Sequence, residues 1–338
     1  FEFSLSFIEM KTYQKQKPCT EETSHSRQLL NKMVNNWSRR AQVIQAKNHN
    51  LEFNNSELAF DTARDDFRTD LLPFKDHPAF LEAPLKMQQK ILSCGWIAYN
   101  EKTVDIESKV VSPACNHIIY QEVPGIDDGI GQEIASQTLV DETYHILLVM
   151  QACRITREQR RLQSLKLPSF NLVKQMTLEQ AKYSQPWQKI LVQIATATVS
   201  EVFISDYLNL LVKDTNIQPM NRLIVDTHRK DEMAHHHIFT NLAQCIYTEL
   251  SPQQQEFFAD VLPLPVRWFA NSELEVWQTM LEYVGFSKTR SLIAECAVTD
   301  EVNLTRIDYS GVISLAEELG VLNSQQGIDS FARQGLLK

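Results

Sequence analysis

The sequence has few glycines, no long apolar run and no regular set of cysteines. Nine glycines in 338 residues are few for a turn-rich β protein, so an all-α fold is favoured. No apolar segment reaches the length that a bilayer-spanning helix needs, so no membrane association is expected. The six cysteines form no Cys-x-x-Cys pair, which is typical of reduced, buried thiols in a cytoplasmic protein.

Positive charge is also in short supply. The formal net charge is −9, which argues against a nucleic-acid partner, because such proteins present basic faces to the phosphate backbone. Apolar residues make up 43% of the chain and charged residues 22%, as in ordinary globular domains. No stretch is long or polar enough to act as an interdomain linker, so residues 1–338 are expected to form a single domain.

Helical spacing of apolar residues predicts a series of helices along the chain. The metal-binding core is expected at about 86–250, with additional helices at both termini. The expected helices cover about 21–47, 56–72, 86–120 with a break near Pro113, 132–157, 186–213, 219–250, 266–284, 288–309, and two short segments after 311.

One segment carries an unusual set of polar side chains. His228, Glu232 and His235 fall within roughly a 60° arc of a helix that turns about 100° per residue. Two imidazoles and a carboxylate on one helix face are typical metal ligands. The sequence Asp231-Glu-Met-Ala-His235 also has an upstream counterpart, Asp141-Glu-Thr-Tyr-His145.

Two further glutamates complete the pattern. Glu107 lies among apolar residues on its predicted helix, and Glu201 lies within a strongly apolar helix, although burial of an unpaired carboxylate is costly. Glu101 shares a polar face and is expected to be a solvated surface acid. Glu107 precedes Glu142 by 35 positions and Glu201 precedes Glu232 by 31. Each half is thus a helix with one glutamate followed by a helix with Glu-x-x-His, the pattern of dinuclear carboxylate sites in four-helix bundles.

Such oxygen-rich ligation suits two iron or manganese ions rather than a closed zinc site. Asp141 and Asp231 are either surface acids or acceptors for the second N–H of a ligand histidine on the other helix pair. His236 remains an alternative to His235, although the Glu-x-x-His repeat favours His235. His237 points away from the cluster in either case.

With three histidines and four glutamates in this order, the sequence resembles the p-aminobenzoate N-oxygenase family. These are non-haem di-iron enzymes that make nitroaryl groups in antibiotic biosynthesis. The resemblance spans Glu107 to His235, and His228 makes it specific, because ferritins, ribonucleotide reductase small subunits and fatty-acyl desaturases have no histidine there. The resemblance implies a ferritin-like four-helix bundle with two iron ions, manganese being disfavoured, and a ligand set of Glu107, Glu142, His145, Glu201, His228, Glu232 and His235.

The resemblance also implies roles and partners. Glu142 and Glu232 would bridge the irons, and O₂ would form a peroxo-diferric species that oxidises an amine nitrogen to hydroxylamine, nitroso or nitro. Electrons would come from an external donor of the reductase or ferredoxin type, because the chain has no flavin, nicotinamide or iron–sulfur fingerprint. The family implies a homodimer. Arg306 is the candidate partner for a substrate carboxylate.

The substrate is most readily an arylamine such as an aminobenzoate, but aliphatic amino acids and carrier-bound amines stay open. Other functional classes also remain. A radical-generating subunit or hydrocarbon hydroxylase would use the same cluster, although His228 argues against both. A ferritin-like iron-binding protein without catalysis is usually shorter, and a helical scaffold would need no metal at all.

Overall fold

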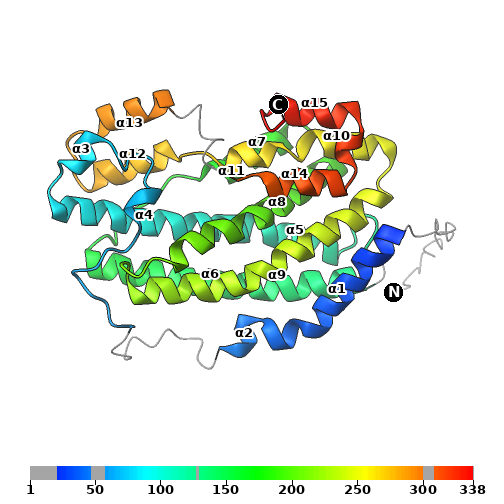
Figure 1. The fold of residues 1–338 in the computed structure, drawn as a ribbon, viewed down its shortest axis with the longest axis horizontal. Helices are drawn as coiled ribbons and strands as arrows, with labels where there is room; N and C mark the ends of the chain where they lie inside the picture. The colour runs from blue at the N-terminus through cyan, green and yellow to red at the C-terminus, as the bar shows by residue number, and fades with distance from the viewer. Residues whose placement is uncertain (1–20, 47–57, 127–128, 300–307, 338) are drawn as a thin grey trace, which may run out of the picture.

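The computed structural model describes residues 21–46, 58–126, 129–299 and 308–337 (Figure 1). Within these residues the chain forms helices and no β-strand, and its extended pairing is limited to an isolated bridge between Asp65 and Ile217. The prediction of an all-α fold is therefore confirmed. Among the described helices, none combines the length and apolar composition that crossing a bilayer requires.

The centre of the fold is a bundle of long helices that run along the longest axis of the molecule (Figure 1). The first of them continues through a π-helical turn into a further helical segment, and the other three are uninterrupted. Helices α8 and α9 pack closely together, as do α4 and α6. The elements of the bundle are α4 (Leu85–Ile106), the π turn (Glu107–Val111), α5 (Ser112–Ile119), α6 (Ile130–Arg160), α8 (Pro186–Val212) and α9 (Pro219–Glu249).

Shorter elements surround the bundle. Helix α1 (Glu21–Arg40) lies against α6 and α9, and the C-terminal helices cover the opposite side (Figure 1). The two short helices predicted after residue 311 are present. The remaining elements are α2 (Gln42–Gln45), η2 (Thr69–Leu71), α3 (Pro78–Leu81), α7 (Asn171–Ala181), α10 (Pro252–Val261), α11 (Leu264–Phe269), α12 (Leu274–Tyr283), α13 (Thr289–Thr299), α14 (Ser310–Glu318), η5 (Val321–Asn323) and α15 (Gln325–Arg333).

A polar layer divides the apolar core of the bundle into two clusters. Along α9, Met220, Ile224 and Val225 belong to one cluster, whereas Ile238 and Leu242 belong to the other. The histidines and acids of α9 lie between these groups. The same change occurs along α4, α6 and α8, so the polar side chains of all four helices meet at one level.

The π turn at Glu107–Val111 stands where the sequence predicts a break near Pro113. Proline has no N–H, so the carbonyl of Lys109, four residues earlier, loses its helical partner. Gln193 of α8 replaces it, donating from Nε2 to Lys109 O at 3.1 Å and to Val110 O at 2.7 Å. The chain therefore continues past Pro113 instead of ending there, and the wider turn begins at Glu107. Such π turns are frequent at functional sites.

The prediction of a helix over 56–72 is wrong for the described part, 58–72, which holds turns and the short η2. Its backbone groups are bound by other elements rather than by their own helix. Arg160 donates to Thr62 O at 3.0 Å and to Arg64 O at 2.6 Å. Gln218 donates to Asp61 O at 2.7 Å. These long-range hydrogen bonds stabilise a non-helical conformation, and the spacing of apolar residues within the segment cannot predict them.

The single helix predicted over 266–284 is divided into α11 and α12. Glu273 adopts a left-handed φ of 53°, and its N–H donates to Asn271 Oδ1 at 2.8 Å. A side-chain acceptor two residues before the N–H favours a turn over a helix. The carboxylate of Glu273 pairs with Nζ of Lys102 on α4 at 2.9 Å, so the break also has a tertiary partner.

The turn between α5 and α6 offers a test of how tightly the bundle is closed. Gly125 has φ of +83°, and a Cβ there would lie 2.1 Å from the backbone oxygen of Cys245 on α9. We expect Gly125→Ala to lower the free energy of unfolding by about 2 kcal/mol or more, because left-handed strain and a backbone clash act together. Urea unfolding followed by circular dichroism measures this change.

Gly129→Ala is the matched control. Gly129 has a similar φ of +80°, but nothing lies within 4 Å of the position that a Cβ would occupy there. The control therefore carries the backbone strain alone and is expected to cost about 1 kcal/mol. Equal losses for the two variants would mean that the α5–α6 turn and α9 do not touch as described.

Candidate metal centre

The polar layer contains all seven side chains that the sequence singled out as ligands. Glu107 begins the π turn, Glu142 and His145 lie on α6, and Glu201 lies on α8, whereas α9 contributes three residues. Every one of the seven is buried, with an exposed fraction of 0 or 1%. The set is Glu107, Glu142, His145, Glu201, His228, Glu232 and His235.

Glu142 and Glu232 lie between the histidines of the two Glu-x-x-His segments. Glu142 is 3.4 Å from Nδ1 of His145 and 3.0 Å from Nδ1 of His235. Glu232 is 3.3 Å from Nδ1 of His145 and 3.4 Å from Nδ1 of His235. Each of these carboxylates therefore contacts both halves of the site, which is the position a bridging carboxylate requires.

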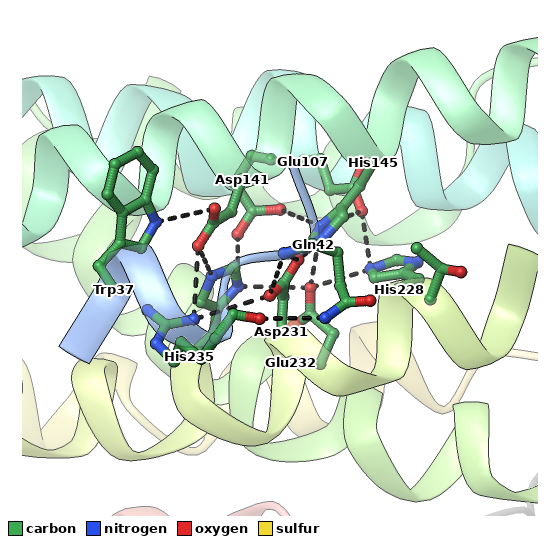
Figure 2. Close-up of polar contacts among 12 residues, drawn as sticks. Trp37, Gln42, Glu107, Asp141, His145, His228, Asp231, Glu232 and His235 are labelled. Atoms are coloured by element: carbon green, nitrogen blue, oxygen red, sulfur yellow. Dashed lines mark hydrogen bonds and ion pairs between the residues drawn. The ribbon is translucent and has the colours of Figure 1, made fainter. Parts of the chain in front are cut away.

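The two halves have different compositions. On one side, Nε2 of His228 lies 3.0 Å from Glu107 and 2.9 Å from Glu232, and its ring centroid is 4.2 Å from that of His145. On the other side, Glu201 lies 3.8 Å from Nδ1 of His235. His228 thus adds a third nitrogen to the site, on the side of Glu107 and His145 (Figure 2).

The donor atoms converge in two overlapping groups of four. Glu107, His145, His228 and Glu232 form one group, and Glu142, His145, Glu232 and His235 form the other, with the candidate ligand atoms of each within 4.8 Å of one another. Glu107, Glu201 and Glu232 each keep a buried carboxylate oxygen that accepts no hydrogen bond from the described residues. Buried oxygens without donors are costly unless a cation binds them. The residues therefore fit a pair of metal ions.

The pKa shifts of the glutamates in this layer also indicate that cations bind here. Burial raises the pKa of Glu107 to about 7. Burial and the neighbouring charges of Glu232 and Glu142 raise the pKa of Glu201 well above its usual value. Burial also opposes ionisation of Glu232, but the adjacent histidines, His235 above all, hold its pKa well below its usual value. Two of the four carboxylates thus lack sufficient positive charge nearby, which bound cations would supply.

Each Glu-x-x-His histidine directs its second ring nitrogen to an aspartate on the opposite helix. His145 Nε2 lies 3.1 Å from Asp231, and His235 Nε2 lies 3.2 Å from Asp141. Both aspartates are fully buried, so the surface-acid interpretation does not describe them. An acceptor at Nε2 fixes the ring orientation and leaves Nδ1 as the nitrogen directed at the carboxylates.

The N-terminal helices hold these two aspartates from outside the bundle (Figure 2). Trp37 Nε1 donates to Asp141 at 2.9 Å, and the backbone N–H of Gln42 donates to Asp231 at 3.1 Å. Arg40 lies 3.5 Å from Asp141 and 3.8 Å from Asp231. The helix predicted over 21–47 is interrupted at buried Ala41, where ψ of 126° turns the N–H of Gln42 toward Asp231.

The remaining sequence expectations have mixed outcomes. His235 faces the cluster, whereas His236 is half-buried beside it and His237 is exposed. Glu101 is a partly exposed acid, 34% exposed, and it also forms an ion pair with Arg157 beside a separate cavity of ≈ 580 Å³. Arg306 lies outside the described residues, so its role stays a prediction.

A cavity of ≈ 610 Å³ flanks the cluster on the α4 side. Its lining includes Ile106, which directly precedes Glu107, and Ile204, which follows Glu201 by less than one helical turn. The cavity is also bounded by the break at 270–273 that separates α11 from α12. Its aromatic lining residues are Phe67, Tyr99, Phe170, Phe269 and Trp277.

The fold and the buried cluster define a ferritin-like helical protein with a carboxylate–histidine site. A profile of the P-aminobenzoate N-oxygenase AurF family matches residues 23–320, so the chain belongs to this family of oxygenases. It is 29% identical over 303 residues to the 4-aminobenzoate N-oxygenase of Streptomyces thioluteus, a match that covers 89% of each chain. The family resemblance and the enzyme class predicted from the ligand pattern are therefore confirmed.

Sequence reasoning missed the residues that hold the two aspartates and those that enclose the cavity. Trp37 precedes Asp141 by 104 positions, and Phe67 and Trp277 reach the cavity from distant segments. No local spacing connects such positions. The signal available in α1 was the helical spacing of Leu29, Leu30, Met33, Val34 and Trp37, which predicts a buried face but not the residue that the indole contacts.

His228 offers the most direct test of the ligand set. We expect His228→Ala to weaken iron binding by at least about tenfold, because it removes a buried nitrogen donor 3.0 Å from Glu107. His237→Ala, on the exposed face of the same helix, is the control and should bind iron like the wild type. Iron per chain after equilibrium dialysis measures both. Equal losses would mean that the register of α9 at the site is wrong.

Proposed function

We propose that this protein is an O₂-dependent di-iron N-oxygenase that converts an arylamine, most readily an aminobenzoate, to its hydroxylamine, nitroso or nitro product. The observation that carries the proposal is the buried set of four glutamates and three histidines beside an aromatic cavity. Membership of the p-aminobenzoate N-oxygenase family supports the reaction class. The activity for which the Streptomyces relative is named, 4-aminobenzoate N-oxygenation, supports the substrate class.

The positions of the ligands suggest how two ions would be shared. Glu107, His145 and His228 would hold one ion, and Glu201 and His235 the other. Glu142 and Glu232, each in contact with both halves, would bridge them. When bound in the ferrous state, two such ions supply O₂ binding and the electrons for its reduction. Iron is favoured over manganese on the family relationship.

The protein's own contribution is to orient ligands and exclude water. Asp141 and Asp231 fix the rings of His235 and His145 from outside the cluster. The apolar clusters on either side of the layer keep bulk water from the site, which strengthens the electrostatic interactions within it. The π turn and helices α6, α8 and α9 thus hold the ligands before any substrate enters, as oxygen chemistry at a preorganised site requires.

The cavity suits a flat aromatic amine. Its aromatic side chains offer stacking and edge contacts to a ring, and ≈ 610 Å³ is within the usual range of small-molecule sites. Ile106 and Ile204, which line the cavity and lie close in the chain to Glu107 and Glu201, support the proposal that an amine directed inward would lie close to the metal ligands. Each oxidation step from amine to hydroxylamine and nitroso then takes place without the ring leaving the cavity.

The opposite end of an aminobenzoate is a carboxylate, which needs a cation. The lysines in the described lining already have acidic partners, since Lys102 pairs with Glu273 at 2.9 Å and Lys75 pairs with Asp76. We therefore retain Arg306 as the proposed carboxylate partner. An external electron donor, assembly as a homodimer and a place in antibiotic biosynthesis complete the proposal.

A single-turnover experiment tests the function. Iron-loaded protein is reduced without oxygen and then mixed with O₂ and an amine, and the products are analysed by mass spectrometry. The panel contains aminobenzoates, other anilines and free amino acids. Oxygen incorporated at nitrogen of an arylamine is the expected result. Oxidation confined to amino acids would replace the substrate class, whereas iron uptake without oxidation of any amine would favour iron storage.

Arg306→Met gives a prediction about specificity. If the guanidinium binds the substrate carboxylate, its loss should raise the KM for 4-aminobenzoate by about tenfold or more, equivalent to about 1.4 kcal/mol, and leave the KM for unsubstituted aniline unchanged. Arg333→Met, an exposed arginine on α15 paired with Asp260, is the control. A uniform loss of kcat with both substrates would contradict the anchoring role.

A further inference from the structure

The two histidine–aspartate pairs differ in what lies beyond them. On the Asp231 side the next group is the backbone N–H of Gln42, at 3.1 and 3.2 Å from the two carboxylate oxygens. On the Asp141 side it is the indole of Trp37, at 2.9 Å. The bundle pairs the two aspartates in the same way, so the difference comes from α1, which carries Trp37, and from α2, which begins at Gln42. Figure 2 shows the indole directed at Asp141 from the edge of the bundle.

The Asp141 side is a short connected path from the surface to the cluster. Trp37 is partly exposed. Its Nε1–H donates to Asp141 Oδ1, and Asp141 Oδ2 lies 3.2 Å from Nε2 of His235. The other ring nitrogen of His235 lies 3.0 Å from Glu142 inside the cluster. Two hydrogen bonds and two conjugated rings therefore connect the surface at Trp37 with the buried cluster.

We propose that Trp37, Asp141 and His235 form the route by which electrons enter the metal centre from an acidic one-electron carrier protein that docks over the C-terminal end of α1. The proposal rests on the proposed function only in that iron occupies the cluster. Hydrogen-bonded contacts couple donor and acceptor orbitals better than van der Waals gaps of the same span. The chain has no flavin or iron–sulfur motif of its own, so its electrons must cross the surface somewhere.

The electron balance is simple. In each encounter the reduced carrier loses one electron and one ferric ion gains it, and two encounters convert both ions to the ferrous state. No bond forms or breaks along the route, because Trp37 and His235 keep their N–H protons throughout. The electron passes through the indole of Trp37, and no oxidised form of the indole accumulates.

The surface over this end of α1 suits an acidic carrier. Lys32 and Arg39 are exposed, and Arg40 is 21% exposed above the two aspartates. These basic groups stand on a chain of net charge −9. Local charge of opposite sign steers an acidic partner to one place on a surface that otherwise repels it.

The test compares two reductants in rapid mixing. Protein loaded with ferric iron is mixed anaerobically with a reduced plant-type [2Fe–2S] ferredoxin, or with dithionite, a small reductant that needs no docking surface. Loss of the ferric absorbance reports the rate, and no amine is needed. We expect Trp37→Phe, compared with the wild type at equal iron content, to slow reduction by ferredoxin by about tenfold or more relative to reduction by dithionite.

Two further variants separate conduction from simple positioning. Trp37→Gln keeps an N–H donor for Asp141 but has no indole, and it should be as slow with ferredoxin as Trp37→Phe. Trp187→Phe, a partly exposed tryptophan on α8 that packs against Phe257 at a centroid distance of 5.3 Å, should leave both rates unchanged. Added salt should slow the reaction of the wild type with ferredoxin, because it screens docking of the acidic carrier.

Several outcomes would overturn the proposal. Recovery of the wild-type rate in Trp37→Gln would make the indole a positioning residue for Asp141. Equal slowing with both reductants at equal iron content would mean the same. A wild type that ferredoxin cannot reduce would exclude this class of carrier. Because the assay follows iron alone, failure to oxidise an amine would leave the route intact and reject only the proposed function.

Discussion

The burial of four carboxylates and three imidazoles in one layer is the constraint on which the rest of the structure depends. Each of these residues has an exposed fraction of 0 or 1%, and unpaired buried charge is among the most costly features a fold can contain. The bundle meets this constraint by bringing all seven to the same level, where each imidazole contacts at least one carboxylate. The oxygens that still lack donors define the place for cations.

The reciprocal aspartates make α6 and α9 interdependent. Asp141 of α6 orients His235 of α9, and Asp231 of α9 orients His145 of α6. Neither helix can shift along its axis without breaking both pairs. The Asp-Glu-x-x-His repeat therefore fixes the two helices relative to each other and also supplies ligands. Helices α1 and α2 add a different outer partner for each aspartate, Trp37 for Asp141 and Gln42 for Asp231.

Local pattern was sufficient for the long helices and for the inward-facing residues, because both follow from 3.6-residue periodicity. Glu107 was identified as an acid on an apolar face, and it is buried. Non-local contacts explain the failures. Residues 58–72 are bound by Arg160 and Gln218 rather than by their own helix. The π turn depends on Gln193, and the contacts of Trp37 cross 104 positions. None of these leaves a periodic signal.

The fold also separates the cavity proposed for the substrate from the surface proposed for electron entry. The cavity lies on the α4 side, enclosed by residues 67–76 and by the break at 270–273. Helix α1 lies against α6 and α9, on the other side of the bundle (Figure 1). A carrier protein docked over α1 would therefore leave the cavity mouth open to substrate, and electrons could be replaced while an intermediate is still bound. In the proposed reaction the first oxygenation, ArNH₂ + O₂ + 2 e⁻ + 2 H⁺ → ArNHOH + H₂O, consumes two electrons from the carrier. Oxidation of the hydroxylamine by O₂, ArNHOH + O₂ → ArNO₂ + H₂O, balances without a donor, so the route over α1 would serve the first oxygenation.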